Sequence, residues 1–135
     1  MTNKELVTKY YEMWNSHDFE KADSLLDADV RFRGSLDITA NGLDGFKDYA
    51  KMIISAFSNL YHAVEITVFE NNMAAVYVTY TGKHDGKLLD YEPTGNRISY
   101  SGAAFFSFKN DKILSINVLG DLNALYKQIG SNANA

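Results

Sequence analysis

Residues 111–130 read DKILSINVLGDLNALYKQIG, and this stretch sets the pattern for the rest of the chain. The apolar run from Ile113 to Leu119 predicts a strand after a turn, and Leu122 to Ile129 have the spacing of an amphipathic helix. Asp121 therefore lies where a strand gives way to a helix. A carboxylate there is either an ordinary N-cap of the helix or an acid/base group at the mouth of a pocket.

Length and composition favour one domain with a sizeable core. The chain has 135 residues, of which 46% are hydrophobic and 22% are charged, and this is typical of a globular protein. Nine tyrosines, eight phenylalanines and one tryptophan suit an aromatic-lined cavity or, equally, a plain core. We expect a single domain over residues 1–130 and a frayed tail over residues 131–135.

Charge and composition exclude several classes of function. The net charge is -4 and there is no stripe of Lys or Arg, so nucleic-acid binding has no electrostatic support. The chain has no cysteine, which excludes disulfides and thiol catalysis, and its three histidines lack metal-binding spacing. The N-terminal segment lacks the apolar core of a signal peptide, and no apolar run approaches the ~20 residues of a membrane helix. We expect a cytoplasmic protein that binds neither membranes nor metals.

The order of the predicted elements indicates an α+β fold. A capping box of Thr2 and Glu5 predicts the start of a first helix, which ends near Asn15. The spacing of apolar residues predicts two further helices, over Phe19–Leu26 and Phe46–Asn59. After a short strand near Val30, period-two spacing predicts long antiparallel strands over residues 61–70, 73–84, 97–109 and 113–119. Glycines beside these strands favour strong bending. We expect a cone-shaped barrel of bent antiparallel sheet, with three N-terminal helices over its concave face and a short C-terminal helix.

Several short strings resemble a known family. They are YYEMWN at 10–15, DSLL at 23–26, Asp29-Val30, Gly45-Phe46, TGKHDG at 81–86, PTGNR at 93–97 and GDLNAL at 120–125. In order and spacing they are similar to the SnoaL-like polyketide cyclases (ester cyclases) of the nuclear transport factor 2-like superfamily, over nearly the whole chain. The resemblance implies a cystatin-like cone, a homodimer formed through the sheet, and intramolecular aldol cyclisation without metal or cofactor.

The resemblance also suggests catalytic residues. The key aspartate of the family, near the C-terminal end of the sheet, matches Asp121, and the histidine of a Thr-Gly-x-His string matches His84. Burial among apolar groups raises the pKa of a carboxyl and suits it to acid/base chemistry. His84 could polarise a carbonyl or relay a proton, although a lone histidine beside a Lys-Asp-Gly turn is more often a surface residue.

Further residues are candidates for binding a substrate. Period two places Asn117, Leu119 and Asp121 on one face of the last strand, and this mixture of polar and apolar side chains is usual in a pocket wall. Arg33 could hold an enolate by charge-assisted bonds or pair with a surface acid. Ser101 leaves room for a ligand or for close packing. We predict Asp121 and His84 as catalytic residues, and as substrate-binding residues Trp14, Arg33, Phe57, Ser101, Asn117 and Leu119.

Three functions remain open. The first is a cofactor-independent enzyme with aldol-type acid/base chemistry on an apolar or aromatic carbonyl substrate, as a cyclase or as a ketosteroid-isomerase-like isomerase or dehydratase. Asp121 would take a proton from a carbon beside the carbonyl, and Arg33, His84 or Asn117 would stabilise the oxyanion. The second is a non-catalytic protein that binds a small hydrophobic ligand. The third is a scaffold that pairs through the convex face of the sheet.

Overall fold

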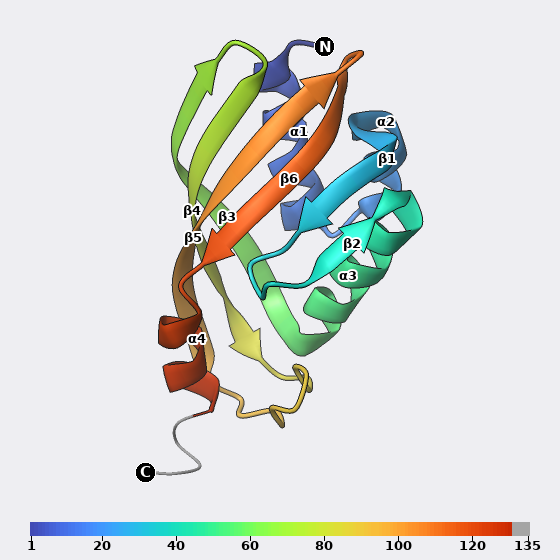
Figure 1. Ribbon diagram of the computed structural model, residues 1–135. Coiled ribbons are helices and arrows are strands. Elements are labelled where there is room, and N and C mark those ends of the chain that lie inside the picture. Colours follow the sequence, from blue (N-terminus) through green and yellow to red (C-terminus); the bar gives the residue numbers. More distant parts are fainter. Residues whose placement is uncertain (131–135) are drawn as a thin grey trace.

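The computed structural model describes residues 1–130, and the predicted tail of residues 131–135 lies outside the described residues. The helical segments that come first are α1 (Asn3–Ser16), the 3-10 helix η1 (Phe19–Lys21), α2 (Ala22–Leu25) and, after two strands, α3 (Gly42–Ala56). The strands are β1 (Leu26–Arg33), β2 (Thr39–Asn41), β3 (Phe57–Glu70), β4 (Met73–His84), β5 (Arg97–Lys109) and β6 (Lys112–Gly120). Helix α4 (Leu122–Ile129) follows them (Figure 1).

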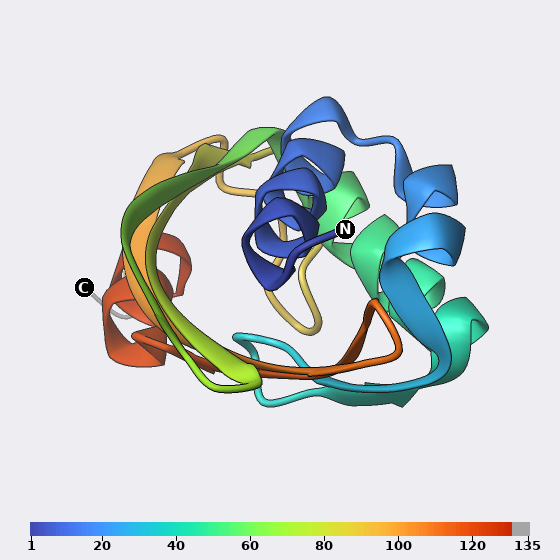
Figure 2. The same ribbon diagram turned by 90° about the horizontal axis from the view of Figure 1, so that it is seen from above.

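All six strands belong to one sheet, in the order β2-β1-β6-β5-β4-β3. The sheet curls around the helices on its concave side, and within the described residues β2 and β3 remain its two open edges (Figure 2). The α+β class and the bent sheet under the helices are confirmed. The sheet is mixed instead of purely antiparallel, because β6 returns between β5 and β1 and runs parallel to β1. Among the described residues no helix is long and apolar enough to span a membrane.

Local chemistry fixes the ends of the helices. The hydroxyl of Thr2 accepts from the backbone N–H of Glu5 at 3.1 Å, and the Glu5 carboxylate accepts from the Thr2 N–H at 3.1 Å, which completes the predicted capping box. Helix α3 begins at Gly42, before the predicted Phe46, and ends at Ala56. It ends early because the chain from Phe57 is already extended and turns its side chain into the core.

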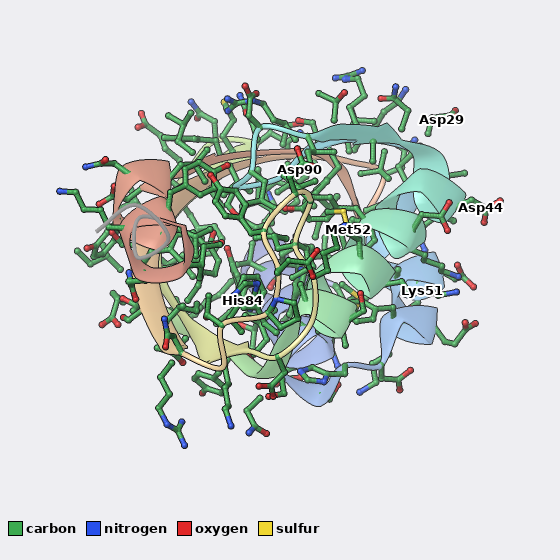
Figure 3. All side chains as sticks on the ribbon, turned by 90° about the horizontal axis from the view of Figure 1, so that it is seen from below. Asp29, Asp44, Lys51, Met52, His84 and Asp90 are labelled. Carbon is green, nitrogen blue, oxygen red and sulfur yellow. The ribbon has the colours of Figure 1, made fainter. Side chains whose placement is uncertain are left out.

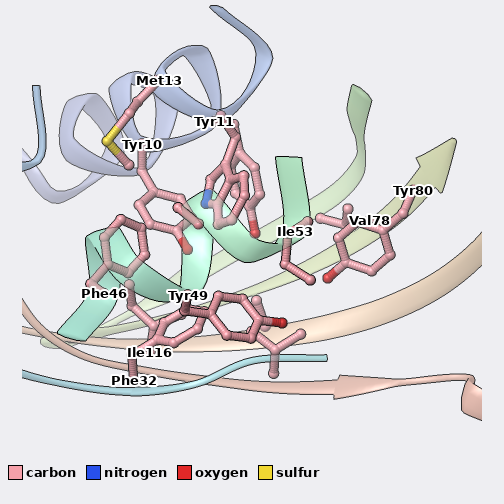
Figure 4. Packing of buried hydrophobic residues seen from close by; sticks show 14 of the residues in the cluster. Tyr10, Tyr11, Met13, Phe32, Phe46, Tyr49, Ile53, Val78, Tyr80 and Ile116 are labelled. Carbon is pink, nitrogen blue, oxygen red and sulfur yellow. The ribbon is translucent and has the colours of Figure 1, made fainter. Parts of the chain in front are cut away.

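The core fills the concave side of the sheet with aromatic rings. Phe46 of α3 is fully buried and lies 6.1 Å from Tyr10, 5.9 Å from Trp14 and 5.1 Å from Phe32, measured between ring centroids. Figure 4 shows side chains of α1 and α3 meeting those of the sheet in this space. Edge-to-face contacts of this kind add to the stabilisation that burial of the rings provides. Aromatic rings from the helices and from the sheet therefore meet in the core, among many buried aliphatic side chains.

A long loop, residues 85–96, crosses one end of the cone, and we call it the strap (Figure 3). In the strap, the N–H of Gly86 donates to the Ala56 carbonyl at 3.0 Å, and the side chain of Leu88 is fully buried. The Tyr91 ring stacks on Tyr126 of α4 with centroids 5.1 Å apart. These contacts tie the strap to α3 and to α4.

Two glycine substitutions should have opposite effects on stability. A Cβ on Gly86 would lie 1.9 Å from the backbone oxygen of Ser55, so Gly86→Ala must displace the strap and should cost about 1–3 kcal/mol. A Cβ on Gly45 in α3 meets its nearest atom at 3.5 Å, so Gly45→Ala should stabilise the helix by up to about 1 kcal/mol. Urea unfolding of both variants measures the contrast, and equal effects of the two would contradict it.

Candidate functional site

An internal cavity lies between α1, α3 and the concave face of the sheet. Its polar lining consists of Tyr10, Tyr11, Trp14, Ser35, Tyr49, His62, Tyr80 and Tyr100, and its apolar lining of Phe32, Ile53, Phe57, Leu60 and Val118. Among these described residues none is Asp, Glu, Lys or Arg. The space that water-sized molecules can occupy in it is about 30 Å³, which is enough for one or two waters. The cavity is therefore nearly filled by its own side chains.

Helical and strand periodicity bring the tyrosines together. Tyr10 and Trp14 are four residues apart on α1, so they share the face that turns to the sheet. Tyr80 of β4 is paired with Tyr100 of β5 across the sheet, and their ring centroids are 4.9 Å apart. Tyr49 enters from α3, and Figure 4 shows it turned toward Tyr80 and the rings of α1. Hydroxyls from both layers of the fold thus reach one space.

The tyrosine hydroxyls are neutral hydrogen-bond donors. Burial raises the pKa of Tyr100 to about 12, and burial also raises the pKa values of Tyr10, Tyr49 and Tyr80 well above their ordinary value. The Tyr100 hydroxyl bonds to the Ser35 hydroxyl at 2.9 Å. Such donors, held in a buried space, stabilise negative charge that develops on an oxygen.

His62 of β3 is the titratable nitrogen group in the cavity lining. Its ring stacks on Trp14 with centroids 4.7 Å apart and meets the Tyr80 ring edge-on at 4.9 Å. Asn15 clamps its backbone, accepting from the His62 N–H at 2.7 Å and donating to the His62 carbonyl at 3.0 Å. Burial, assisted by the nearby His17, lowers the pKa of His62 to about 3, so the ring is neutral. The His62 Nδ1 is buried and has no hydrogen-bond partner among the described residues.

Asp121 points back along the last helix and not into the cavity. Its carboxylate accepts from the Ala124 N–H at 3.1 Å, and its own N–H donates to the Ser101 carbonyl at 2.8 Å. The side chain is exposed. Asp121 is thus the N-cap of α4, which is the first of the two alternatives that the sequence offered.

The face expected to form the pocket wall is on the opposite side of the sheet. Leu119 is 55% exposed on the convex surface, Asn117 is exposed there too, and Ser101 is half-buried. The concave positions of β6 are Ile116 and Val118. The assignment of faces was therefore wrong, because an almost filled cone selects the uniformly apolar set for its interior.

Arg33 also lies outside the cavity. Its Nε donates to the Asp37 carboxylate at 2.8 Å, and its Nη1 donates to the Val118 carbonyl at 3.1 Å and lies 3.5 Å from the Asn117 side-chain oxygen. This is the surface-acid alternative for Arg33. Of the predicted substrate-binding residues, the structure places Trp14 and Phe57 in the cavity lining.

His84 is fully buried at the end of β4, but it is not among the described residues that line the cavity. Its Nδ1 accepts from the Thr94 N–H at 3.3 Å and lies 3.0 Å from the Thr94 hydroxyl. Burial lowers the pKa of His84, so the ring stays neutral and can accept these bonds. Figure 3 shows His84 where the strap begins, so its ring joins the two ends of the strap.

The predicted site residues included none of the five tyrosines of the lining and not His62. The sequence did contain a signal for Tyr80 and Tyr100. Because side chains alternate between the two faces of a strand, each of these tyrosines falls on the same face as large apolar residues of its strand. A bulky aromatic face opposite a small and polar face indicates which side of a bent sheet is interior. His62 gave no such signal, because its role depends on Trp14 and Tyr80, which are far from it in sequence.

Comparison with known proteins decides the family. The family model of the SnoaL-like polyketide cyclases matches residues 4–129. The chain belongs to this family. A search of curated proteins finds no significant match.

Solved structures share the SnoaL-like fold. A protein described as a SnoaL-like polyketide cyclase from Jannaschia Sp. CCS1 is 19% identical, with a TM-score of 0.88 over 96% of this chain and 92% of that one. One described as a polyketide cyclase from Pseudomonas putida is 22% identical, with a TM-score of 0.84 over 96% and 99%. IdmH from Streptomyces antibioticus, also described as a polyketide cyclase, is 15% identical, with a TM-score of 0.82 over 95% and 98%.

The SnoaL-like cavity of this chain offers hydrogen-bond donors and one imidazole. The tyrosine hydroxyls can hold an oxyanion, and the rings can hold a flat apolar molecule between them. Among the described residues, no three His, Asp or Glu side chains gather as metal ligands would. The arrangement suits proton transfer to and from a neutral carbonyl compound.

The buried His62 should make stability fall as the pH is lowered. Between pH 6.5, the ordinary pKa of histidine, and about 3, the unfolded chain binds a proton that the folded chain does not. His62 therefore lowers the free energy of unfolding by about 1.4 kcal/mol per pH unit as the pH falls through this window. His62→Gln should show a shallower pH dependence in urea unfolding, whereas His17→Gln should keep most of the native slope. Parallel slopes for native and His62→Gln would refute the assignment.

Proposed function

We propose that this SnoaL-like protein is a cofactor-independent cyclase that performs aldol-type acid/base chemistry on a neutral, flat carbonyl compound inside the tyrosine-lined cavity. The observation that carries the proposal is the gathering of buried, neutral tyrosines around one cavity whose described lining has no Asp, Glu, Lys or Arg. A charged substrate would find no counter-charge in such a lining. A neutral carbonyl compound gains ring contacts and hydroxyl donors.

The chemistry requires a negative charge to form on oxygen. Removal of a proton from the carbon beside a carbonyl gives an enolate, whose oxygen accepts hydrogen bonds from tyrosine hydroxyls. The enolate carbon then attacks a second carbonyl of the same molecule, and the resulting alkoxide takes up a proton. Tyr80 and Tyr100 are placed to donate because their paired strands hold both rings on the cavity wall.

Access to the cavity requires movement of its walls. A cyclic ketone is several times larger than the space of about 30 Å³ that is free in the cavity. The Ser35–Tyr100 hydrogen bond, at 2.9 Å, joins the β1–β2 connection to β5 and can open at the cost of one neutral hydrogen bond. Substrate binding by this protein therefore includes displacement of lining side chains.

Carbon–hydrogen exchange of a simple aryl ketone tests the proposal without the natural substrate. The native protein should accelerate exchange of the α-hydrogens of β-tetralone in deuterated water, measured by proton NMR. Tyr80→Phe removes an oxyanion donor and should slow this exchange about a hundredfold. The Asp121 side chain caps α4 outside the cavity, so Asp121→Asn should leave the rate of α-hydrogen exchange within about twofold of native.

The controls separate the alternatives. Loss of exchange in Asp121→Asn with full exchange in Tyr80→Phe would restore the aspartate as the catalytic residue. Binding of β-tetralone without exchange, seen by isothermal titration calorimetry, would favour the second function, a binding protein for small hydrophobic ligands. If β-tetralone neither bound nor exchanged its α-hydrogens, a role for the cavity would be refuted.

We also propose that the convex face of the sheet forms a homodimer. Four neighbouring strands expose large apolar side chains on it, each at least 40% exposed: Ile66, Val68, Met73, Tyr77, Phe105 and Leu119. A contiguous apolar surface of this kind is uncommon on a monomer, and a two-fold axis would bury it against itself. The tyrosine cavity lies on the other, concave side of the sheet, so dimer formation through the convex face does not cover it.

Introducing a charge into this face should prevent self-association. Val68→Lys places an ammonium among the apolar side chains and should yield a monomer in sedimentation velocity at micromolar concentration. Leu89→Lys, at a strap position with 45% exposure, is the matched control and should keep the native state. A native protein that sediments as a monomer would contradict the proposal.

A further inference from the structure

We propose that His62 takes the proton from the substrate carbon and exchanges it with solvent through the groove between α1 and β3. This inference rests on the proposed function, because it assigns the proton acceptor of that reaction. It makes His62 a catalytic residue, although no family resemblance or local motif pointed to it.

A proton acceptor must be held in a fixed position, and the surroundings of His62 hold it in this way. Its backbone is clamped by both atoms of the Asn15 amide, and its ring is held between the Trp14 face and the Tyr80 edge. The side chain is 8% exposed, yet Nδ1 is buried without a partner among the described residues. A buried polar atom left unpaired calls for an explanation, and Trp14 Nε1 of the same lining is unpaired among the described residues as well, so a molecule bound in the cavity would give both atoms a partner.

The other polar groups of the cavity lining are far weaker bases than an imidazole. The tyrosines are neutral hydroxyls, whose further protonation is strongly unfavourable, and the Trp14 indole only donates. Ser35 is engaged with Tyr100. A neutral imidazole always has one nitrogen with a free lone pair, so His62 is the acceptor that remains among the described lining residues.

A surface groove also reaches His62. It runs along α1 and β3, offers about 340 Å³ to water-sized molecules, and is lined in part by Thr8, Glu12 and Tyr61. Tyr11 and His62 are the two described residues that line both this groove and the cavity. Of these two, the imidazole is the group that can carry a proton from one side to the other.

The proton step balances within the substrate and His62. The α C–H bond breaks, its electron pair forms the enolate, and the proton moves to the imidazole. The enolate oxygen is held by the tyrosine hydroxyls while its carbon forms the new carbon–carbon bond. The alkoxide that results takes the proton back, and His62 is neutral again.

The neutral state of His62 fits this role. Burial lowers the pKa of the ring because an imidazolium would lose its hydration and finds no acidic side chain in the described cavity lining. The ring is thus unprotonated when the substrate arrives. An enolate formed beside it supplies the missing negative charge, so proton transfer creates both members of an ion pair together.

Exchange of β-tetralone α-hydrogens also tests this inference. His62→Gln should bind the ketone with native affinity by calorimetry but should exchange its α-hydrogens about a hundredfold more slowly. His17→Gln, at a neighbouring histidine whose ring bonds to the Leu60 carbonyl, is the matched control and should exchange at the native rate or faster. Native exchange in folded His62→Gln would overturn the role of His62 and leave the proposed function standing.

Chemical rescue covers the case in which His62→Gln fails to fold. His62→Ala leaves a space of the shape of the missing ring, and added imidazole should restore exchange in proportion to its concentration. A purely structural role of His62 would not give such rescue. Absence of exchange in the native protein would refute the proposed function itself, and folded His62→Ala without rescue would overturn only the inference about His62.

Discussion

The whole structure depends on filling the concave side of a bent sheet with rings. A sheet that curls this far leaves a deep interior, and α1 and α3 reach it with Tyr10, Trp14, Phe46 and Tyr49. Rings bury large areas and contribute strongly to the hydrophobic stabilisation, but tyrosine rings bring hydroxyls with them. Stability and chemistry therefore come from the same side chains, and the polar cavity is a by-product of how the cone is packed.

Local patterns predicted most elements because their chemistry is local. The capping box of α1, the break between the strands that end at residue 70 and begin at residue 73, and the bounds of α4 each depend on residues within a few positions of one another. The faces of β6 could not be read in this way. Either of the two alternating sets of β6 side chains could form the wall of a pocket. Only packing against parts of the fold that are distant in sequence decides that Ile116 and Val118 face inward. The parallel pairing of β1 with β6 is equally long-range.

The predicted site illustrates a further limit of local reasoning. Asp121 occupies the junction that a family pattern highlights, and in this chain that junction is used to cap a helix. The candidate groups of the cavity come instead mainly from five separate elements, α1, α3, β3, β4 and β5. A fold shared at about 20% identity preserves the cone and leaves its lining free to change. Chemistry within such a family has to be argued from the lining of each member.

The stacking of Trp14 on His62 gives the protein an internal optical reporter. Trp14 is the single tryptophan of the chain, so all indole emission arises from the wall of the cavity. The fluorescence of Trp14 depends on the charge of the His62 imidazole, whose ring centroid lies 4.7 Å from its own, and on any aromatic ligand that binds beside it. Ligand arrival and protonation of His62 can thus be followed in real time in the unlabelled protein.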